Sequence, residues 1–151
     1  MEIVRGTREA QEVMGLHESV RMEDLGDFFS RAMTAAGEAL AARGVNPVGP
    51  PVALYQGMTE EKFDVTAGFP VAAGATPSGD VVVATLPGGA TVEAIHQGSY
   101  DGLSATYDEL TAWFKDNGMP LPTVMWEEYL VGPESEADPS HWRTRIMYPM
   151  G

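Results

Sequence analysis

The stretch Met125-Trp126-Glu127-Glu128-Tyr129 decides the fold, because an earlier stretch, Pro51-Val52-Ala53-Leu54-Tyr55, stands at the same place in a similar half of the chain. Tyr129 corresponds to Tyr55 in this register, and Glu127 corresponds to Ala53. The second half therefore has a carboxylate where the first half has a methyl group. Folding of a repeated scaffold does not by itself require that carboxylate, so we expect the function to depend on it.

The flanking segments follow the same order in both halves. Each half has an apolar stretch at helical spacing, over residues 25–44 and about 103–118, and each stretch ends at a glycine with a proline close behind. Each half closes on an aromatic residue, a proline and an apolar residue, in Phe69-Pro70-Val71 and Tyr148-Pro149-Met150. The order predicts a first repeat over about 12–71, a linker over 72–80 and a second repeat over about 81–150.

Local patterns predict a strand, a helix and two more strands in each repeat. The predicted strands cover residues 12–20, 52–55 and 63–71 in the first repeat. In the second repeat they cover 81–96, with a turn or bulge at 87–89, then 125–131 and 142–147. Residues 1–11 are predicted to be a tail or a short edge strand. The whole pattern predicts an α+β fold, in which two βαββ modules with pseudo-two-fold symmetry form an antiparallel sheet with two helices and a central cleft.

Length and composition predict one soluble domain over residues 1–151. A chain of this length buries roughly 70% of the surface that its unfolded form exposes, so it needs no disulfide, and it has no cysteine. No apolar run approaches the roughly 18 residues that a membrane span requires. No export signal is recognisable at the N-terminus, so we expect a cytoplasmic protein.

The net charge of −13, from 9 basic and 22 acidic residues, argues against direct nucleic-acid binding, because binding to phosphates needs clustered Lys and Arg. A well-solvated surface is the simpler interpretation of this charge. The alternative is that the acidic surface steers cationic ligands toward the protein.

The chain resembles the GyrI-like effector-binding domain, a small-molecule-binding module that many AraC- and MerR-type bacterial regulators carry at their C-terminal end and that also occurs alone. The matching segments span nearly the whole chain: Gly49-Pro50-Pro51…Tyr55, Asp64…Gly68-Phe69-Pro70-Val71, Leu86-Pro87-Gly88-Gly89, His96-Gln97-Gly98-Ser99-Tyr100-Asp101, Trp126-Glu127-Glu128-Tyr129-Leu130 and Trp142-Arg143-Thr144…Pro149. The resemblance implies two βαββ (SHS2) modules and an aromatic-lined cavity, with a glutamate, placed at Glu127, that meets cationic lipophilic ligands. Family members often have an acidic residue at the position of Arg145 and a small or apolar residue at that of Glu128. Arg145 could therefore neutralise Glu127.

Strand alternation places Met125, Glu127 and Tyr129 on one face of the sheet and Trp126, Glu128 and Leu130 on the other. We expect Glu127 to point into the cleft, because it corresponds to the small Ala53, and we expect Glu128 to be a solvated strand residue. A buried Glu127 needs a cation, a tyrosine hydroxyl or Arg145 as its partner. The candidate ligand-binding residues are Glu127, Tyr55, Trp126, Tyr129, Tyr148 and Arg145.

No cofactor or metal is indicated. His17, His96 and His141 lack the spacing of metal ligands, and Pro87-Gly88-Gly89 lacks the Lys and Ser/Thr of a phosphate-binding loop. His96 is either a base at the rim of the cleft or a hydrogen-bonded structural histidine, and we prefer the structural role.

Three functions fit these observations. The first is a stand-alone module that senses or sequesters a small hydrophobic or cationic molecule, without direct contact to nucleic acid or membrane. The second, implied by the resemblance, is a hydrolase of strained, cyclopropane-containing natural products, with Glu127 as general base and Tyr129 or Tyr148 assisting. The third is a protein-interaction role like that of a gyrase inhibitor.

Overall fold

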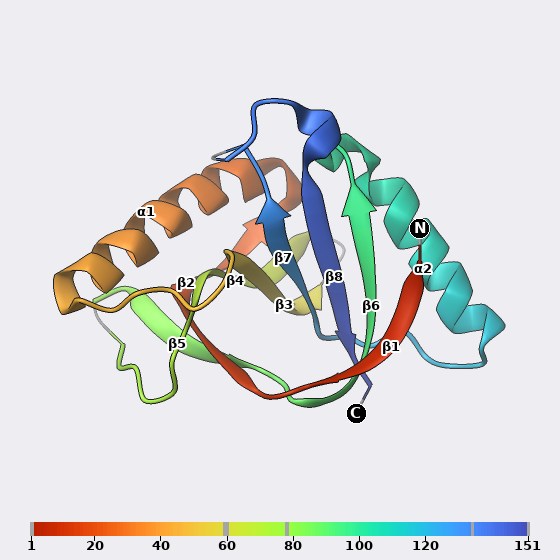
Figure 1. The fold of residues 1–151 in the computed structure, drawn as a ribbon, viewed down its shortest axis with the longest axis horizontal. Coiled ribbons are helices and arrows are strands. Elements are labelled where there is room, and N and C mark those ends of the chain that lie inside the picture. Colours follow the sequence, from red (N-terminus) through yellow and green to blue (C-terminus); the bar gives the residue numbers. More distant parts are fainter. Residues whose placement is uncertain (1, 59–60, 78, 134, 151) are drawn as a thin grey trace.

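A computed structural model describes residues 2–58, 61–77, 79–133 and 135–150 (Figure 1). The strands are β1 (Ile3–Arg8), β2 (Gln11–Arg21), β3 (Val52–Met58), β4 (Lys62–Val71), β5 (Val81–Leu86), β6 (Gly89–Gln97), β7 (Met125–Val131) and β8 (Arg143–Pro149). The α-helices are α1 (Leu25–Arg43) and α2 (Leu103–Asp116), and short 3-10 helices are η1 (Met22–Asp24), η2 (Tyr100–Gly102) and η3 (Pro139–His141). None of the helices in these described ranges is both long and apolar enough to span a bilayer.

All eight strands belong to one antiparallel sheet with the order β1-β6-β8-β7-β3-β4-β2-β5. The unit β2-α1-β3-β4 and the unit β6-α2-β7-β8 meet along the β3–β7 pair, and the strand order mirrors itself about that pair. Ala53 lies directly opposite Glu127 there. The sequence repeat predicted a pseudo-two-fold axis between the two units, and this axis passes between the two equivalent residues.

The first strand of each half pairs with the other half. β1 pairs with β6, and β5 pairs with β2, so β1 with β2 and β5 with β6 form two long, bent strands that run side by side. Residues 1–11 thus contain an edge strand rather than a tail. The two long strands approach each other closely at Gly88, where a Cβ atom would lie 2.7 Å from the backbone nitrogen of Ala10. A side chain at this position would force the strands apart.

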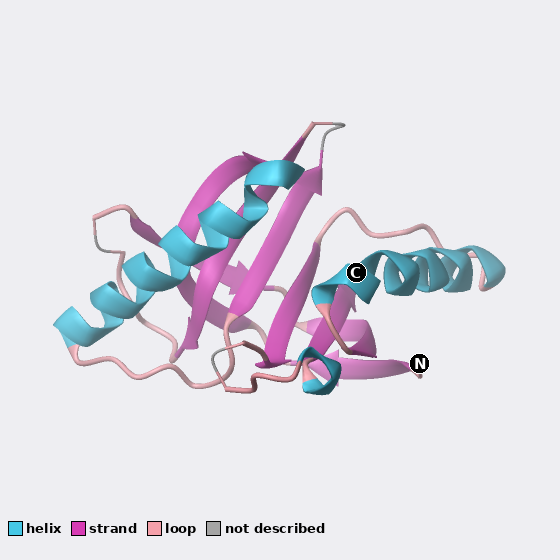
Figure 2. Cartoon of the chain, turned by 90° about the horizontal axis from the view of Figure 1, so that it is seen from above, coloured by secondary structure: helices cyan, strands magenta, loops and turns pink. Residues whose placement is uncertain are grey.

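Both faces of the sheet are buried. On one face α1 packs over the first half and α2 over the second, and Figure 2 shows the helices beside opposite ends of the sheet. On the other face no α-helix contributes to the buried cluster formed by Val13, Val52, Leu54, Leu86, Trp126 and Met147. The bend of the long strands makes that face concave. Apolar area removed from water on both faces stabilises the fold by roughly 25 cal/mol per Å².

The helices form where the sequence predicted them. In α1, Phe28, Ala32, Ala36 and Leu40 recur at helical spacing and are buried. Gly44 ends the helix in the left-handed conformation with φ 66°, which glycine adopts without steric cost. In α2, Leu110 and Phe114 are buried one turn apart and face β6 and β8.

Candidate functional site

Glu127 lies at the centre of the molecule, on the face of β7 that the helices cover. Glu127 is only 5% exposed, and Ala53, opposite it on β3, is fully buried. The methyl group of Ala53 leaves room on the axis for one longer side chain. A buried carboxylate is costly unless donors replace the water that it loses, so the partners of Glu127 define the chemistry of the site.

Two tyrosine hydroxyls are the donors to Glu127. The Tyr129 hydroxyl donates to Oε1 at 2.7 Å, and the Tyr107 hydroxyl, from α2, donates to Oε2. The ion pairs formed among the described residues do not include Glu127. Its carboxylate is therefore held by neutral groups, and a positive charge placed beside it would gain more than it would beside a neutralised carboxylate.

Burial raises the pKa of Glu127 above its ordinary value of 4.5, although hydrogen bonds from Tyr107 and Tyr129 and the charge of His96 oppose the rise. Burial, followed by the charge of Glu127, also raises the pKa of Tyr55, Tyr107 and Tyr129. The pKa of Tyr148 rises to about 12 for the same two reasons. All four hydroxyls therefore stay protonated at neutral pH, and Glu127 acts on each of them.

Aromatic rings surround this cluster. Tyr129 packs edge-on against Phe29 at 6.2 Å between ring centroids and against Tyr100 at 6.1 Å, and Tyr100 lies 5.0 Å from Trp142. Tyr55, Tyr107 and Tyr129 are half-buried, whereas Glu127 behind them is buried. Three tyrosines thus separate the carboxylate from solvent. Aromatic ring faces attract cations and flat apolar ligands, so this wall suits the same ligands as the carboxylate.

His96 holds the junction between β6 and α2. Its Nδ1 lies 2.8 Å from Thr106 Oγ1 and its Nε2 lies 2.8 Å from the Ser99 carbonyl oxygen. Both ring nitrogens are occupied, which agrees with the structural role that we preferred. On the strand next to His96, Thr144 Oγ1 is buried without a hydrogen-bond partner. Thr144 also lies opposite Tyr129, so an unused hydroxyl stands next to the tyrosine cluster.

Glu128 faces the concave side of the sheet and has charged partners. Arg145 Nη1 donates to its Oε1 at 2.7 Å, Trp126 Nε1 donates to its Oε2 at 3.0 Å, and Arg8 Nη1 lies 3.5 Å from Oε2. The expectation that Glu128 is solvated was wrong, because the curled sheet buries both faces and leaves this residue 7% exposed. Arg145 pairs with Glu128, so it does not form an ion pair with Glu127.

The structure brings four of the six candidate ligand-binding residues together: Glu127, Tyr55, Tyr129 and Tyr148. It places Trp126 and Arg145 on the opposite face, with Glu128. Tyr107 was not among the candidates predicted from the sequence, and its bond to Glu127 was missed. A signal was present, because Tyr107 and Phe29 each lie four residues after the first residue of their helices. This pair repeats the asymmetry of Glu127 and Ala53.

Where the sequence predicted a cleft between the halves, the hydroxyls of Tyr107 and Tyr129 donate to Glu127. Two surface pockets of the structure lie elsewhere: one lies beside Glu12 and the other beside Arg31. Within the described part of the chain, no three His, Cys, Asp or Glu side chains are grouped to hold a metal ion.

Comparison with known proteins defines the class of this fold and site. The model of the GyrI-like small molecule binding domain matches residues 1–150, and the chain belongs to this family. No curated protein matched the chain.

Among solved structures, the chain is similar to EcmrR in a cryo-EM complex with DNA, at 24% identity and a TM-score of 0.85. The match covers 98% of this chain and 56% of that one, so this chain spans little more than half of EcmrR. The EcmrR C-terminal domain alone matches at 23% identity and a TM-score of 0.84, over 98% of this chain and 96% of the domain. The charge-based expectation that this chain avoids nucleic acid stays a prediction, because one of these structures contains DNA.

Two more distant structures of similar fold are a complex with a ligand and a hydrolase. SAV2435 bound to tetraphenylphosphonium has 14% identity and a TM-score of 0.71, over 97% of this chain and 92% of that one. A hydrolase from Listeria innocua has 13% identity and a TM-score of 0.65, over 98% and 91%. At these identities the likeness shows a shared fold.

Proposed function

We propose that this protein binds a small, hydrophobic, cationic molecule at Glu127 and thereby senses or sequesters it. The observation that carries the proposal is a buried carboxylate whose hydrogen-bond partners are two neutral tyrosine hydroxyls. The aromatic wall adds affinity for an apolar cation. A relative of the same fold has been solved with tetraphenylphosphonium, a cation of this kind.

Binding would proceed by exchange of donors at the carboxylate. Tyr107 comes from α2, whereas Glu127 and Tyr129 share β7, so a small shift of α2 or a rotation of the Tyr107 ring would free Oε2 without disturbing the sheet. The cation would then occupy the position of the Tyr107 hydroxyl. Thr144 Oγ1 offers a further polar contact beside Tyr129.

The experiment is isothermal calorimetry with tetraphenylphosphonium and with a neutral aromatic of similar shape, triphenylphosphine oxide. In Glu127→Gln the affinity for the cation should fall by roughly 10- to 100-fold, because a charge-assisted interaction is lost while the shape is kept. The affinity for triphenylphosphine oxide should change less than about threefold, since apolar contacts are unchanged. Equal losses for both ligands, or no loss for the cation, would reject the proposal.

A hydrolase is the second candidate, favoured by the close contact of Glu127 with two hydroxyl donors and by the hydrolase of the same fold. Glu127 would act as general base on water, and Tyr107 or Tyr129 would donate to the leaving group. Product analysis with a cyclopropane-bearing electrophile tests it. Turnover should fall by roughly two to four orders of magnitude in Glu127→Gln. Absence of turnover by the wild-type protein would leave binding as the function.

A further inference from the structure

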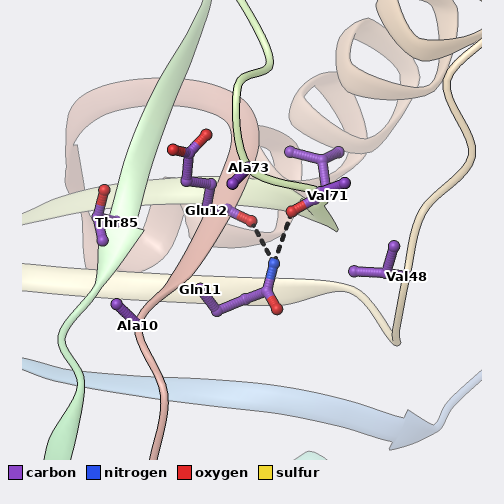
Figure 3. Close-up of a pocket in the computed structure, with 8 residues that line it drawn as sticks. Ala10, Gln11, Glu12, Val48, Val71, Ala73 and Thr85 are labelled. Atoms are coloured by element: carbon purple, nitrogen blue, oxygen red, sulfur yellow. Dashed lines mark hydrogen bonds between the residues drawn. The ribbon is translucent and has the colours of Figure 1, made fainter.

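We propose a second ligand site, separate from Glu127, in which the Glu12 carboxylate binds the ammonium group of a small organic amine. The site is a pocket of about 260 Å³ at the start of β2 (Figure 3). Its lining comes from β2, from the end of β4 and the linker after it, from β5 and from the loop before β3. It does not include any residue of the Glu127 site, so this inference does not depend on the proposed function.

Glu12 supplies the charge. Its Oε2 atom is buried and has no hydrogen-bond partner, and the ion pairs of the described residues do not include it. In Figure 3 the side chain rises between Thr85 and Ala73, at the wall of the pocket. Glu127 and Glu128 are each held by two or more donors, whereas this oxygen of Glu12 has none. A buried, unsatisfied carboxylate oxygen is costly, so a donor from outside the chain would be bound favourably.

Small apolar side chains form most of the remaining wall: Ala10, Val48, Val71, Ala72 and Ala73. Gln11 closes the wall from below, because its Nε2 donates to the carbonyl oxygens of Glu12 at 2.9 Å and Val71 at 2.7 Å. These two bonds occupy the amide nitrogen and fix the side chain. The pocket therefore offers one negative charge beside a hydrocarbon surface, which matches an amine with a short apolar body.

The volume of the pocket excludes large molecules, and its shortage of oxygen ligands excludes metal ions. A volume of 260 Å³ lies just below the range of about 300–1,000 Å³ in which proteins hold drug-sized molecules, so only a small molecule fits. Calcium and magnesium need about six or more oxygen ligands, and the wall of alanine and valine carbons does not supply them. The net charge of −13 also favours cations over anions near this surface.

The test ligand is benzylammonium, and the control ligand is benzyl alcohol, which has a similar shape but no charge. Titration of isotope-labelled protein, followed by NMR, should shift the signals of Ala10, Val71 and Ala73 with benzylammonium and much less with benzyl alcohol. In Glu12→Gln the affinity for benzylammonium should fall by roughly tenfold or more, because the charged acceptor is lost. Glu38→Gln, which removes an exposed acidic group on α1, is the control for net charge and should bind like the wild type.

Two further variants complete the test. Ala73→Leu should fill the pocket and abolish the shifts without a change of charge, and it replaces Glu12→Gln as evidence if that variant fails to fold. In Glu127→Gln the benzylammonium affinity measured from the signals of Ala10, Val71 and Ala73 should not change, which separates this site from the proposed function. Equal binding of the amine and the alcohol, unchanged affinity in Glu12→Gln or Ala73→Leu, or shifts confined to the tyrosine cluster would overturn the proposal.

Discussion

The two halves of the molecule build the same scaffold with different side chains at its centre. The first half places Ala53 and Phe29 on the helix-covered face, and the second half places Glu127 and Tyr107 at the equivalent positions. Phe29 packs against the Tyr129 ring, while Tyr107 donates its hydroxyl to the carboxylate. Because the apolar pair supports the fold in one half, we propose that the polar pair in the other half serves a ligand.

A second comparison lies within β7, where two adjacent glutamates have opposite environments. Glu128 is held by Arg145 and Trp126, whose nitrogens can only donate hydrogen bonds, whereas Glu127 is held by hydroxyls that can donate or accept. A side chain that carries an NH₂ group is therefore tolerated at Glu127 and not at Glu128. We therefore expect Glu128 to serve the fold, and we propose Glu127 as the carboxylate that binds the ligand.

The largest expected effect is on stability, from Glu128→Gln. The amide NH₂ would face an arginine or the indole N–H, and Arg145 would lose its anionic partner, so the free energy of unfolding should fall by about 2–4 kcal/mol. Urea unfolding followed by circular dichroism measures this, with Glu127→Gln as the matched variant. A loss in Glu127→Gln as large as that in Glu128→Gln would remove the distinction between the two glutamates.

The next effect is a pH dependence of stability that Glu127 causes and that the equivalent Ala53 cannot cause. Burial raises the pKa of Glu127 in the folded protein above the ordinary value of 4.5. The folded state therefore holds this proton more tightly than the unfolded state, so its contribution to stability is present below about pH 4.5 and is lost as the pH rises through the folded pKa. The free energy of unfolding of wild type should fall relative to that of Glu127→Gln over this interval. A constant difference between pH 4 and pH 8 would mean that Glu127 is not desolvated.

Tyr107→Phe tests the donor that comes from α2. One hydrogen bond is lost, so the free energy of unfolding should fall by about 1 kcal/mol. The affinity for tetraphenylphosphonium should rise rather than fall, because the cation no longer competes with the hydroxyl for Oε2. Calorimetry on both proteins decides this. A weaker affinity in the variant would show that Tyr107 contacts the ligand instead of giving way to it.

The smallest effect is expected from Phe29→Tyr, which gives the first half the hydroxyl of the second. Phe29 is half-buried and Ala53 provides no acceptor, so the change in stability should stay within about 0.5 kcal/mol and the ligand affinity should not change. The same unfolding and calorimetric measurements apply. A marked gain in cation affinity would mean that position 29, in the first half, also contacts the ligand.

Much of this architecture could be predicted, because local sequence patterns indicate its helices and strands. The periodicity of Phe28, Ala32 and Ala36 predicted α1, and the repeat predicted that Glu127 is equivalent to Ala53. The exchange of β1 and β5 between the halves was not predicted, because pairing between distant strands leaves no local signal. That exchange buries the second face, which is why alternation alone could not show that Glu128 is buried.

The errors at the site have the same origin. Trp126 was included because aromatic rings can line a pocket, although alternation put it on the face of Glu128. Arg145 was included because it could neutralise Glu127. Tyr107 was not among the candidates, because it shares a helix face with Leu110 and periodicity does not report what a hydroxyl contacts. Only the comparison with Phe29 could have identified it.

The central claim is that the second half carries Glu127 for a ligand and not for the fold. The most direct test is urea unfolding of wild type and Glu127→Gln at pH 7, each with and without tetraphenylphosphonium. Without the cation the variant should be at least as stable as wild type. The cation, at a concentration near 100 times its dissociation constant, should raise the free energy of unfolding of wild type by about 2–3 kcal/mol. It should raise that of the variant far less. A variant that is less stable without the cation, and that gains as much from it as wild type does, would contradict the claim.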